Sequence, residues 1–370
     1  MELERELLIR LSRITFNQNE ENDIKDILTN NRINWFQFFK YALYHKTAIL
    51  CWKNIKRIEP HSFIPKYLDD MLNYCYISTK KRNEMNQKEM QVIQDSLIAS
   101  DIICIPVKGI YLLENVYHDY GLRYSGDMDF LVKKSDIKKL DSALTHLGYV
   151  MGHYSNSRHC IDPISREEKL KWRMYMSNVC PYVRISGIDL FPIYKLDFRH
   201  SLDDNLNPEP INLIIDSYIN NKKVDNIYYF LHLCTHFFDE AKHIVDIELF
   251  KDLNIIKLCD IREFYLQNQS RLSVKEFANF TNRFNFGEQV FFTMSFLKAI
   301  YNDGYEDKIL ELINYDNSDT LISFGDNAFE SNQFSQKDIF ERLFSCRNID
   351  DIVAPSKLGI KKINNELYYE

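Results

Sequence analysis

Two aspartates separated by a single residue are the strongest chemical signal in the sequence. Asp127 and Asp129 lead into an apolar run that ends at Val132. Residues two apart in a β-strand point to the same face, so the two carboxylates lie side by side while Met128 and Phe130 face a core. Two carboxylates on one rigid edge suit divalent cations that hold a triphosphate. An isolated Asp-x-Asp is also common at solvated turns and helix caps, so its context decides its meaning.

A Lys-Gly corner precedes the acid pair. Lys108 and Gly109 end the short apolar run 102–107. Glycine lets the backbone approach phosphate oxygens, strand-to-helix turns expose N–H donors, and the lysine adds a positive charge. Arg123, four residues before Asp127, has three interpretations: a phosphate contact, a brace for the acid pair, or a structural salt bridge.

A third acid lies on a later predicted strand. In residues 193–199, Lys195, Asp197 and Arg199 share one face of the strand and the apolar residues take the other. Nucleotidyl transfer uses such a set of acids: one metal ion lowers the pKa of the attacking hydroxyl, and a second stabilises the leaving pyrophosphate. The protein contributes mainly placement and charge neutralisation.

Histidines recur in the segment 231–243. His232, His236, Asp239 and His243 fall at i, i+4, i+7 and i+11, on one face of a helix. Three interpretations are open: a mononuclear metal site, a polar face that lines a cleft and helps to hold nucleotide or acceptor, and a structural stripe. The absence of an HExxH or HD signature disfavours the metal site.

The elements that must position these residues can be predicted from hydrophobic periodicity. Residues 1–97 have apolar positions at helical spacing. The next part alternates short apolar runs with amphipathic segments, which is the strand–helix order of α/β packing. The predicted strands are 102–107, 128–132, one that begins at 149, 182–190 and 193–199, and the predicted helices between them are 110–117 and 137–147.

Helical periodicity returns in the second half of the chain, with helices predicted at 227–238, 253–266, 274–284 and 287–301. The polar segment 154–180 has no clear period, and its basic residues fit either an acceptor-binding loop or a solvated surface. We predict four parts: a helical N-terminal domain (1–97), an α/β core (98–205), a helical C-terminal domain (206–301) and a weakly patterned tail with one or two helices (302–370).

Composition limits the class of protein. The chain has 370 residues, 45% of them hydrophobic and 27% charged, which is typical of a globular protein of two or three domains. A net charge of −7 argues against a general nucleic-acid coat. The 8 cysteines form no CxxC pair, no apolar stretch approaches about 18 residues, and the N-terminus has no signal-like core. These features predict a cytoplasmic protein with reduced thiols and no membrane segment.

The motifs together resemble the polymerase-β-type nucleotidyltransferase superfamily and, within it, the bacterial "uncharacterised nucleotidyltransferase" family. The resemblance covers about residues 35–270 and rests on Val107-Lys108-Gly109, Tyr117, residues 123–132, Leu147-Gly148-Tyr149, Leu196-Asp197-Phe198, residues 231–243 and Leu258-Cys259-Asp260-Ile261. The chain departs from the superfamily in having Lys-Gly for the usual Gly-Ser corner. It also reads Asp197-Phe-Arg-His200 where the family often has Asp-x-His-Trp.

The resemblance implies an α/β (α+β) fold: a polymerase-β-type nucleotidyltransferase core with a small mixed sheet, flanked by the two helical domains. It implies that Asp127, Asp129 and Asp197 are catalytic and hold two Mg²⁺ ions, with Mn²⁺ as a substitute. Asp197 would also help to activate the acceptor hydroxyl. The residues expected to bind the nucleoside triphosphate, with ATP favoured, are Lys108, Gly109, Arg123, Ser125 and His236.

The expected reaction moves a nucleoside monophosphate from a nucleoside triphosphate to a hydroxyl of a small-molecule or peptide acceptor and releases pyrophosphate. Members of the family often accompany clusters that make modified peptides, polysaccharides or other secondary metabolites. Two alternatives are open: another sugar- or phosphate-transfer reaction on the same fold, and a non-catalytic binding or antitoxin-like protein. The three acids argue against the second, and the acidic net charge argues against a nucleic-acid acceptor.

Overall fold

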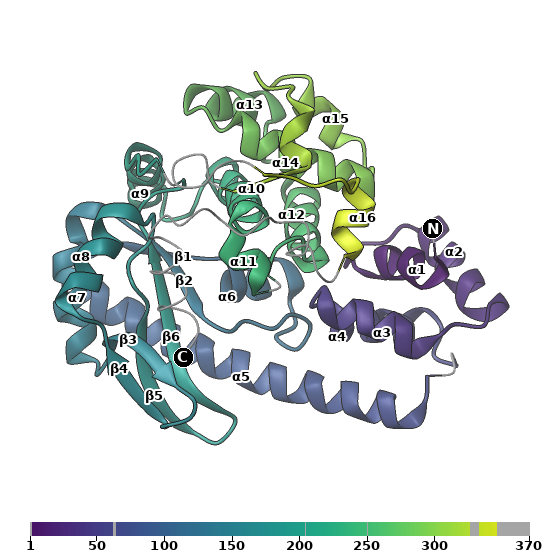
Figure 1. Cartoon of the computed structure of the whole chain (residues 1–370), viewed down its shortest axis with the longest axis horizontal. Coiled ribbons are helices and arrows are strands. Elements are labelled where there is room, and N and C mark those ends of the chain that lie inside the picture. Colours follow the sequence, from purple (N-terminus) through teal and green to yellow (C-terminus); the bar gives the residue numbers. More distant parts are fainter. Residues whose placement is uncertain (1, 62–63, 204, 250, 326–332, 346–370) are drawn as a thin grey trace. The chain divides into compact units, whose positions relative to one another are not determined.

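The computed structural model describes residues 2–61, 64–203, 205–249, 251–325 and 333–345 (Figure 1). The described chain forms two compact units that alternate along the sequence. The helical unit comprises residues up to 79, residues 121–123 and residues from 233 onward; the sheet unit comprises residues 80–120 and 124–232. The four-part linear division proposed above stays a prediction.

A six-stranded mixed sheet is the centre of the sheet unit. Its strands lie in the order β1-β2-β6-β5-β3-β4, and only β2 and β6 pair in parallel. The strands are β1 (Cys104–Val107), β2 (Met128–Val132), β3 (Val150–Ser155), β4 (Cys160–Pro163), β5 (Tyr182–Ile188) and β6 (Phe191–Arg199). All five predicted strands are therefore present, and β4 is an addition. The expected fold of mixed α and β elements with a mixed sheet is confirmed.

The parallel pair β2–β6 is held by an apolar ladder. Met128 pairs with Leu196, and Phe130 pairs with Phe198, whose ring stacks on it with centroids 4.9 Å apart. All four side chains are buried. Burying such cross-strand pairs fixes the register, because a slip of one residue would turn every apolar side chain to the other face.

The described part of the sheet unit also contains helices. The predicted helix 110–117 begins two residues earlier, as α6 (Lys108–Leu112), and continues as a π-helical turn, η1 (Leu113–Tyr117). The helices of the sheet unit include η2 (Lys134–Asp136), α7 (Ile137–His146), α8 (Arg166–Tyr175) and α9 (Glu209–Asn221). The long helix α5 (Lys66–Ala99) supplies residues 80–99 to this unit, and α10 (Asn226–Lys242) supplies residues 226–232.

The segment without a predicted period, 154–180, forms a hairpin and a helix. Strand β4 pairs with β3 so closely that a Cβ on Gly152 would lie 2.2 Å from the carbonyl oxygen of Asp162. Helix α8 begins with a capping box between Ser165 and Glu168 and buries Trp172. The basic side chains here form exposed ion pairs: Arg158 with Asp162, Lys169 with Asp141, and Lys171 with Glu167.

The helical unit contains the chain's first helices and its last described ones. Its helices are α1 (Leu3–Leu11), α2 (Gln18–Asn30), α3 (Trp35–Tyr44), α4 (Ala48–Ile58), α11 (Ile244–Glu248), α12 (Ile255–Asn268), α13 (Val274–Arg283), α14 (Gly287–Ile300), α15 (Tyr305–Leu310), η3 (Ser318–Leu321) and α16 (Ile339–Phe344). Residues up to 79 of α5 and from 233 of α10 also belong to it. A two-stranded ribbon, β7 (Ser323–Phe324) with β8 (Gln333–Phe334), completes it. Helices α15, η3 and α16 lie in the part of the predicted tail that the structure describes, and the rest of that tail lies outside the described residues.

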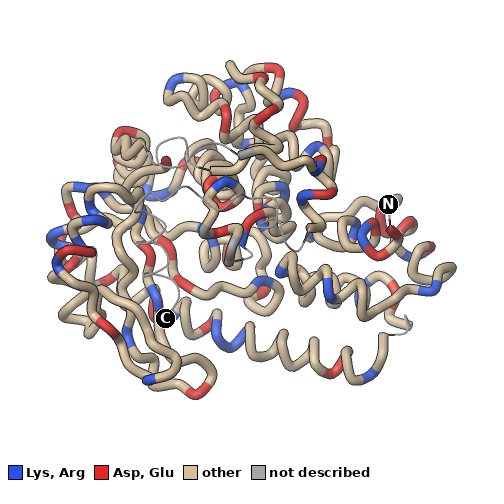
Figure 2. The backbone as a smooth tube through the Cα atoms, viewed as in Figure 1, with Lys and Arg blue, Asp and Glu red and all other residues tan. Residues whose placement is uncertain are grey.

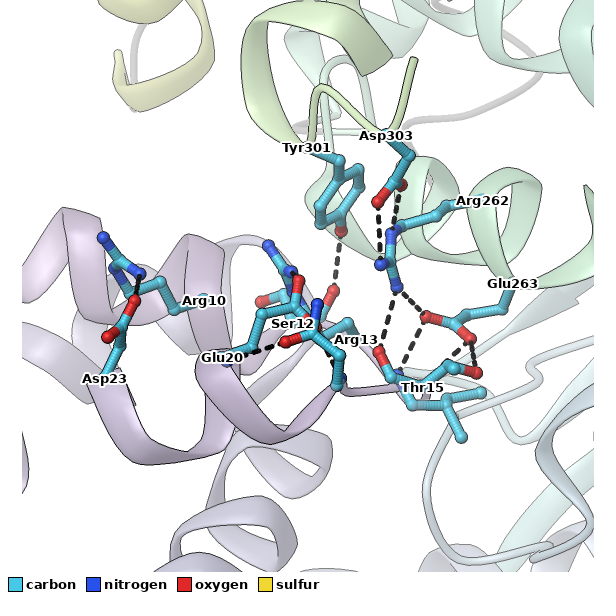
Figure 3. A network of polar contacts seen from close by, with 12 residues as sticks. Arg10, Ser12, Arg13, Thr15, Glu20, Asp23, Arg262, Glu263, Tyr301 and Asp303 are labelled. Carbon is cyan, nitrogen blue, oxygen red and sulfur yellow. Dashed lines mark hydrogen bonds and ion pairs between the residues drawn. The ribbon is translucent and has the colours of Figure 1, made fainter. Parts of the chain in front are cut away.

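A buried polar network joins the first helices of the helical unit to α12 (Figure 3). Glu263 is fully buried and accepts hydrogen bonds from the backbone N–H groups of Ile14 (3.0 Å) and Thr15 (3.1 Å) and from the Thr15 hydroxyl (2.7 Å). Arg262 donates to Glu263 at 2.5 Å and to Asp303 at 2.6 Å. The network fixes the turn after α1 against helices that follow about 250 residues later in the sequence.

Charge is spread over both units. Figure 2 shows lysine and arginine interspersed with aspartate and glutamate along the backbone of each unit. Among the described residues, no helix combines the length and the apolar character needed to cross a bilayer.

Candidate active site

The pairing of β2 with β6 brings the three predicted acids to one face of the sheet. Asp129 of β2 pairs with Asp197 of β6, and Asp127 immediately precedes β2. Leu196 and Phe198, which alternate with Asp197, are buried. The strand pairing therefore places the acids on two neighbouring parallel strands, and the alternation of polar and apolar residues predicted the face of each strand on which they lie.

Lys108 neutralises the most buried of these acids. Its Nζ lies 2.6 Å from Oδ1 of Asp129, whose residue is 6% exposed. Burial raises the pKa of Asp129 to about 7; the carboxylates of Asp127 and Asp197 act in the same direction and Lys108 opposes them. Burial also disfavours the Lys108 ammonium, but the three neighbouring carboxylates outweigh it and raise the pKa of Lys108 above its ordinary value.

The backbone of Lys108 is itself unusual. Its φ of 52° is in the left-handed region, which a non-glycine residue adopts at a cost of about 1–2 kcal/mol. This conformation occurs where β1 ends and α6 begins. The ion pair with Asp129 offsets part of that cost and fixes the side chain beside the acids.

A second lysine, Lys195, forms an ion pair with Asp127. Nζ of Lys195 lies 3.7 Å from Oδ2 of Asp127, and both side chains are more than a third exposed. Oδ1 of Asp197 accepts a hydrogen bond from the side-chain amide of Asn178 at 3.2 Å. Three carboxylates and two ammonium groups thus share one face of β2 and β6.

The loop that carries Asp127 is held by polar side chains of α5. The amide of Asn83 donates to the carbonyl oxygen of Tyr120 (2.7 Å), and that of Asn86 donates to Ser125 (3.3 Å). Arg82 donates to the carbonyl oxygen of Gly126 at 3.1 Å. Each bond satisfies a carbonyl oxygen of the loop that has no partner in a strand. These bonds hold the backbone of the loop just before Asp127 against α5.

The donor set suits a hard divalent cation. Magnesium prefers oxygen ligands and is commonly bound through one or two carboxylates together with substrate phosphates. Across the ranges that the structure describes, no three or more His, Cys, Asp or Glu side chains are arranged as a ready metal site. At the acids, the ammonium groups of Lys108 and Lys195 lie among the carboxylates instead. The three side chains fit Mg²⁺ by their chemistry and would hold it once these ion pairs open.

Comparison with known proteins identifies the family. A family model described as "Uncharacterised nucleotidyltransferase" matches residues 31–302, nearly three quarters of the chain. The chain belongs to this nucleotidyltransferase family. It is therefore a transferase of phosphorus-containing groups, and the family implies a nucleoside triphosphate substrate. No curated protein and no solved structure matches it.

Of the residues predicted to bind nucleotide in this nucleotidyltransferase, three lie in the sheet unit. Lys108 and the buried Gly109 adjoin Asp129 at the start of α6. The hydroxyl of Ser125 is turned into its own loop and donates to the carbonyl oxygen of Asp127 at 2.9 Å. That bond gives Ser125 a bracing role in the acid loop.

The other two predicted nucleotide ligands belong to the helical unit. Arg123 donates from Nε (2.9 Å) and Nη2 (2.7 Å) to the carboxylate of Asp260, and both side chains are largely buried. The structural salt bridge, one of the three interpretations of Arg123, is thus observed. His236 lies 3.5 Å from Glu240, whose carboxylate also contacts Lys257.

The histidine segment does not form a metal site in the described residues. His232 is fully buried, and burial lowers its pKa well below the ordinary value. His243 follows the end of α10 and its Nδ1 lies 3.6 Å from Asp246. These surroundings favour structural roles for the segment over metal binding.

Sequence reasoning missed the residues that support the acids from outside the strands. Asn83 and Asn86 continue the buried spacing of Met90, Ile93 and Leu97 along α5, so polar residues on an otherwise apolar stripe were the available signal. Asn178 gave no signal, because its partner Asp197 is identified only by the fold.

Proposed function

We propose that this nucleotidyltransferase moves a nucleoside monophosphate from a nucleoside triphosphate, with ATP as the favoured donor, to a hydroxyl of a small-molecule or peptide acceptor. The acceptor oxygen attacks the α-phosphorus, the bond from that phosphorus to the β-phosphate oxygen breaks, and pyrophosphate leaves. The hydroxyl proton passes to a base, for which Asp197 is the candidate. The catalytic core would be of the polymerase-β type.

One observation carries the proposal: Asp129 and Asp197 pair in register on two parallel strands, with Asp127 on the same face. Three carboxylates gathered on one face support a site at which a triphosphate and an acceptor would meet. Mg²⁺, bound by Asp127, Asp129 and Asp197 as one or two ions, would neutralise phosphate charge and lower the pKa of the attacking hydroxyl.

The protein's own groups have defined tasks in this proposal. Asp129 is held rigidly in β2, and Asn178 orients Asp197 by its hydrogen bond at 3.2 Å. Lys108 and the backbone of Gly109, where β1 turns into α6, would contact phosphate oxygens. Rigid placement of this kind lowers the entropic cost of bringing donor and acceptor together.

The decisive experiment is calorimetric titration of the protein with each of the four nucleoside triphosphates, with and without Mg²⁺. We expect Mg²⁺-dependent binding of one of them, and loss of that binding in Asp129→Asn with an unchanged circular dichroism spectrum. Asp216→Asn is the matched control, since Asp216 pairs with Lys133 at the surface of the same unit. Equal binding by Asp129→Asn and the native protein would overturn the proposal.

The mass gained by an acceptor distinguishes the proposed reaction from its alternative. Candidate hydroxyl-bearing peptides and small molecules would be incubated with the preferred nucleotide and analysed by mass spectrometry. A gain of one nucleoside monophosphate supports nucleotidyl transfer. A gain of a bare phosphate or of a sugar would assign the fold to a different transfer reaction.

A further inference from the structure

Lys195 is a charged residue of the acid face to which the sequence assigned no task. It lies on β6 two residues before Asp197, and its neighbour Leu196 is buried on the opposite face. The strand therefore presents Lys195 and Asp197 on the same side. The ammonium group is 3.7 Å from Asp127, and the Lys195 side chain is 37% exposed.

The two lysines of the acid face differ in how tightly they are held. Lys108 contacts the buried Asp129 at 2.6 Å, and its side chain is 15% exposed. Lys195 contacts a more exposed carboxylate at 3.7 Å, which is an ion pair beyond hydrogen-bond distance. Partly exposed pairs of this kind contribute little stability. The ammonium group of Lys195 can therefore change partner at a smaller cost in stability than that of Lys108.

Charge makes an anion the natural new partner. With all five of these groups ionised, the charges of the three carboxylates and the two ammonium groups sum to one net negative charge. A divalent cation on the carboxylates changes this to one net positive charge. A cation that engages Asp127 would also weaken the attraction of that carboxylate for Lys195, so the ammonium group would be left near the phosphate chain of a bound nucleotide.

We propose that Lys195 binds the phosphate chain of the nucleotide, releasing Asp127 to the cation and donating to a non-bridging phosphate oxygen. This inference rests on the proposed function. Lysine is a compact point charge with three donors on a flexible stem and suits a phosphate oxygen. Lys195 is thus a nucleotide ligand on the strand that carries Asp197, in addition to Lys108 and Gly109 at the start of α6.

The test measures cation binding and nucleotide binding separately in Lys195→Met. Mn²⁺ is titrated without nucleotide by electron paramagnetic resonance, and ATP with Mg²⁺ by calorimetry. We expect the Kd for ATP to rise about 10- to 100-fold, the loss of one charge-assisted hydrogen bond. The Kd for Mn²⁺ should stay unchanged or fall, because a competing ammonium group is removed. Lys195→Arg should restore part of the ATP affinity.

Two controls separate the possible failures. Lys133→Met removes a surface lysine of the same unit and should change neither Kd. If Asp129→Asn loses both ligands while Lys195→Met binds ATP normally, the proposed function stands and the role of Lys195 is wrong. If Asp129→Asn binds Mn²⁺ and ATP like the native protein, the proposed function fails whatever Lys195→Met shows. Loss of Mn²⁺ binding together with a lowered Tm in Lys195→Met would make Lys195 a structural residue and overturn its assignment.

Discussion

A single histidine illustrates how burial sets the chemistry of one residue. His45 is fully buried, its Nδ1 accepts a hydrogen bond from the backbone N–H of Ile255 at 3.3 Å, and its ring packs against Phe344. Burial lowers the pKa of His45 to about 3, while the backbone of Leu253 acts weakly in the opposite direction. Only the neutral ring is compatible with the folded helical unit above that pH.

This lowered pKa predicts sensitivity to acid. An unfolded histidine has a pKa of about 6.5, so the stabilising contribution is complete above that pH and is lost as the pH falls from 6.5 towards 3. At pH 5.5 the loss from His45 is about 1.4 kcal/mol. Urea unfolding at pH 7.5 and 5.5 should show a smaller drop in His45→Gln than in the native protein by about that amount.

The comparison uses the change between the two pH values, because His45→Gln also alters packing at both. His146→Gln, at an exposed position on α7, should leave the drop unchanged. Identical drops in the native protein and in His45→Gln would show that His45 is not buried as a neutral ring.

At the scale of elements, α5 shapes the acid loop through hydrogen bonds. Asn86 is buried and donates to the carbonyl oxygen of Ser125, two residues before Asp127. Asn86→Leu keeps the branched shape of the side chain and removes the donor, so it should lower the unfolding free energy by about 1–3 kcal/mol. Because the loop end is released, the Mn²⁺ affinity should also fall several-fold.

The same change at Asn73, an exposed position of α5, is the matched control for helix propensity and apolarity. Stability comes from urea unfolding and cation affinity from Mn²⁺ titration. Native Mn²⁺ affinity in a destabilised Asn86→Leu protein would show that the hydrogen bond supports the fold without positioning the acids.

At the scale of the whole molecule, the helical unit depends on contacts between distant parts of the sequence. Glu263 accepts hydrogen bonds from Ile14 and Thr15, and the ring of Tyr41 in α3 meets that of Phe344 in α16 edge to face. Glu263→Gln replaces one acceptor oxygen by a donor that faces other donors. We expect a loss of about 3–5 kcal/mol of unfolding free energy, the usual cost of breaking a buried charged network.

Urea unfolding of Glu263→Gln beside Glu311→Gln, an exposed glutamate, measures this cost. A change below about 1 kcal/mol in Glu263→Gln, comparable with that of an ordinary surface substitution, would contradict the assigned role of the network.

Prediction from sequence succeeded where the pattern is local. The strand 128–132 and the alternation through Leu196 and Phe198 are both correct, because each apolar residue there enters the core of its own sheet. The hairpin and helix of 154–180 were not predictable in this way. Trp172 packs with Met151, Ile164, Met176 and Cys180, which are too scattered to form a period.

In the candidate site too, the residues with a local sequence pattern were predicted and those that depend on long-range packing were not. The three acids follow from a strand pattern and a resemblance, so the sequence could predict that they share a face. The partners of Arg123 and Lys195 come from elsewhere in the chain: Asp260 is 137 residues from Arg123 in the sequence. Such pairs depend on tertiary packing and strand register, neither of which leaves a local signal.

The interleaving of the two units determines the order in which the protein can fold during synthesis. The described sheet unit is complete in sequence at residue 232, whereas Thr15 needs Glu263, 248 residues later. At ribosomal rates of about 5–20 residues per second, that wait is on the order of ten to fifty seconds. The sheet with its three acids can therefore form while the first helices of the nascent chain still lack their final partners. During that interval α1 to α4 can pack on one another, while the turn after α1 and the ring of Tyr41 stay without the contacts that Glu263 and Phe344 later provide.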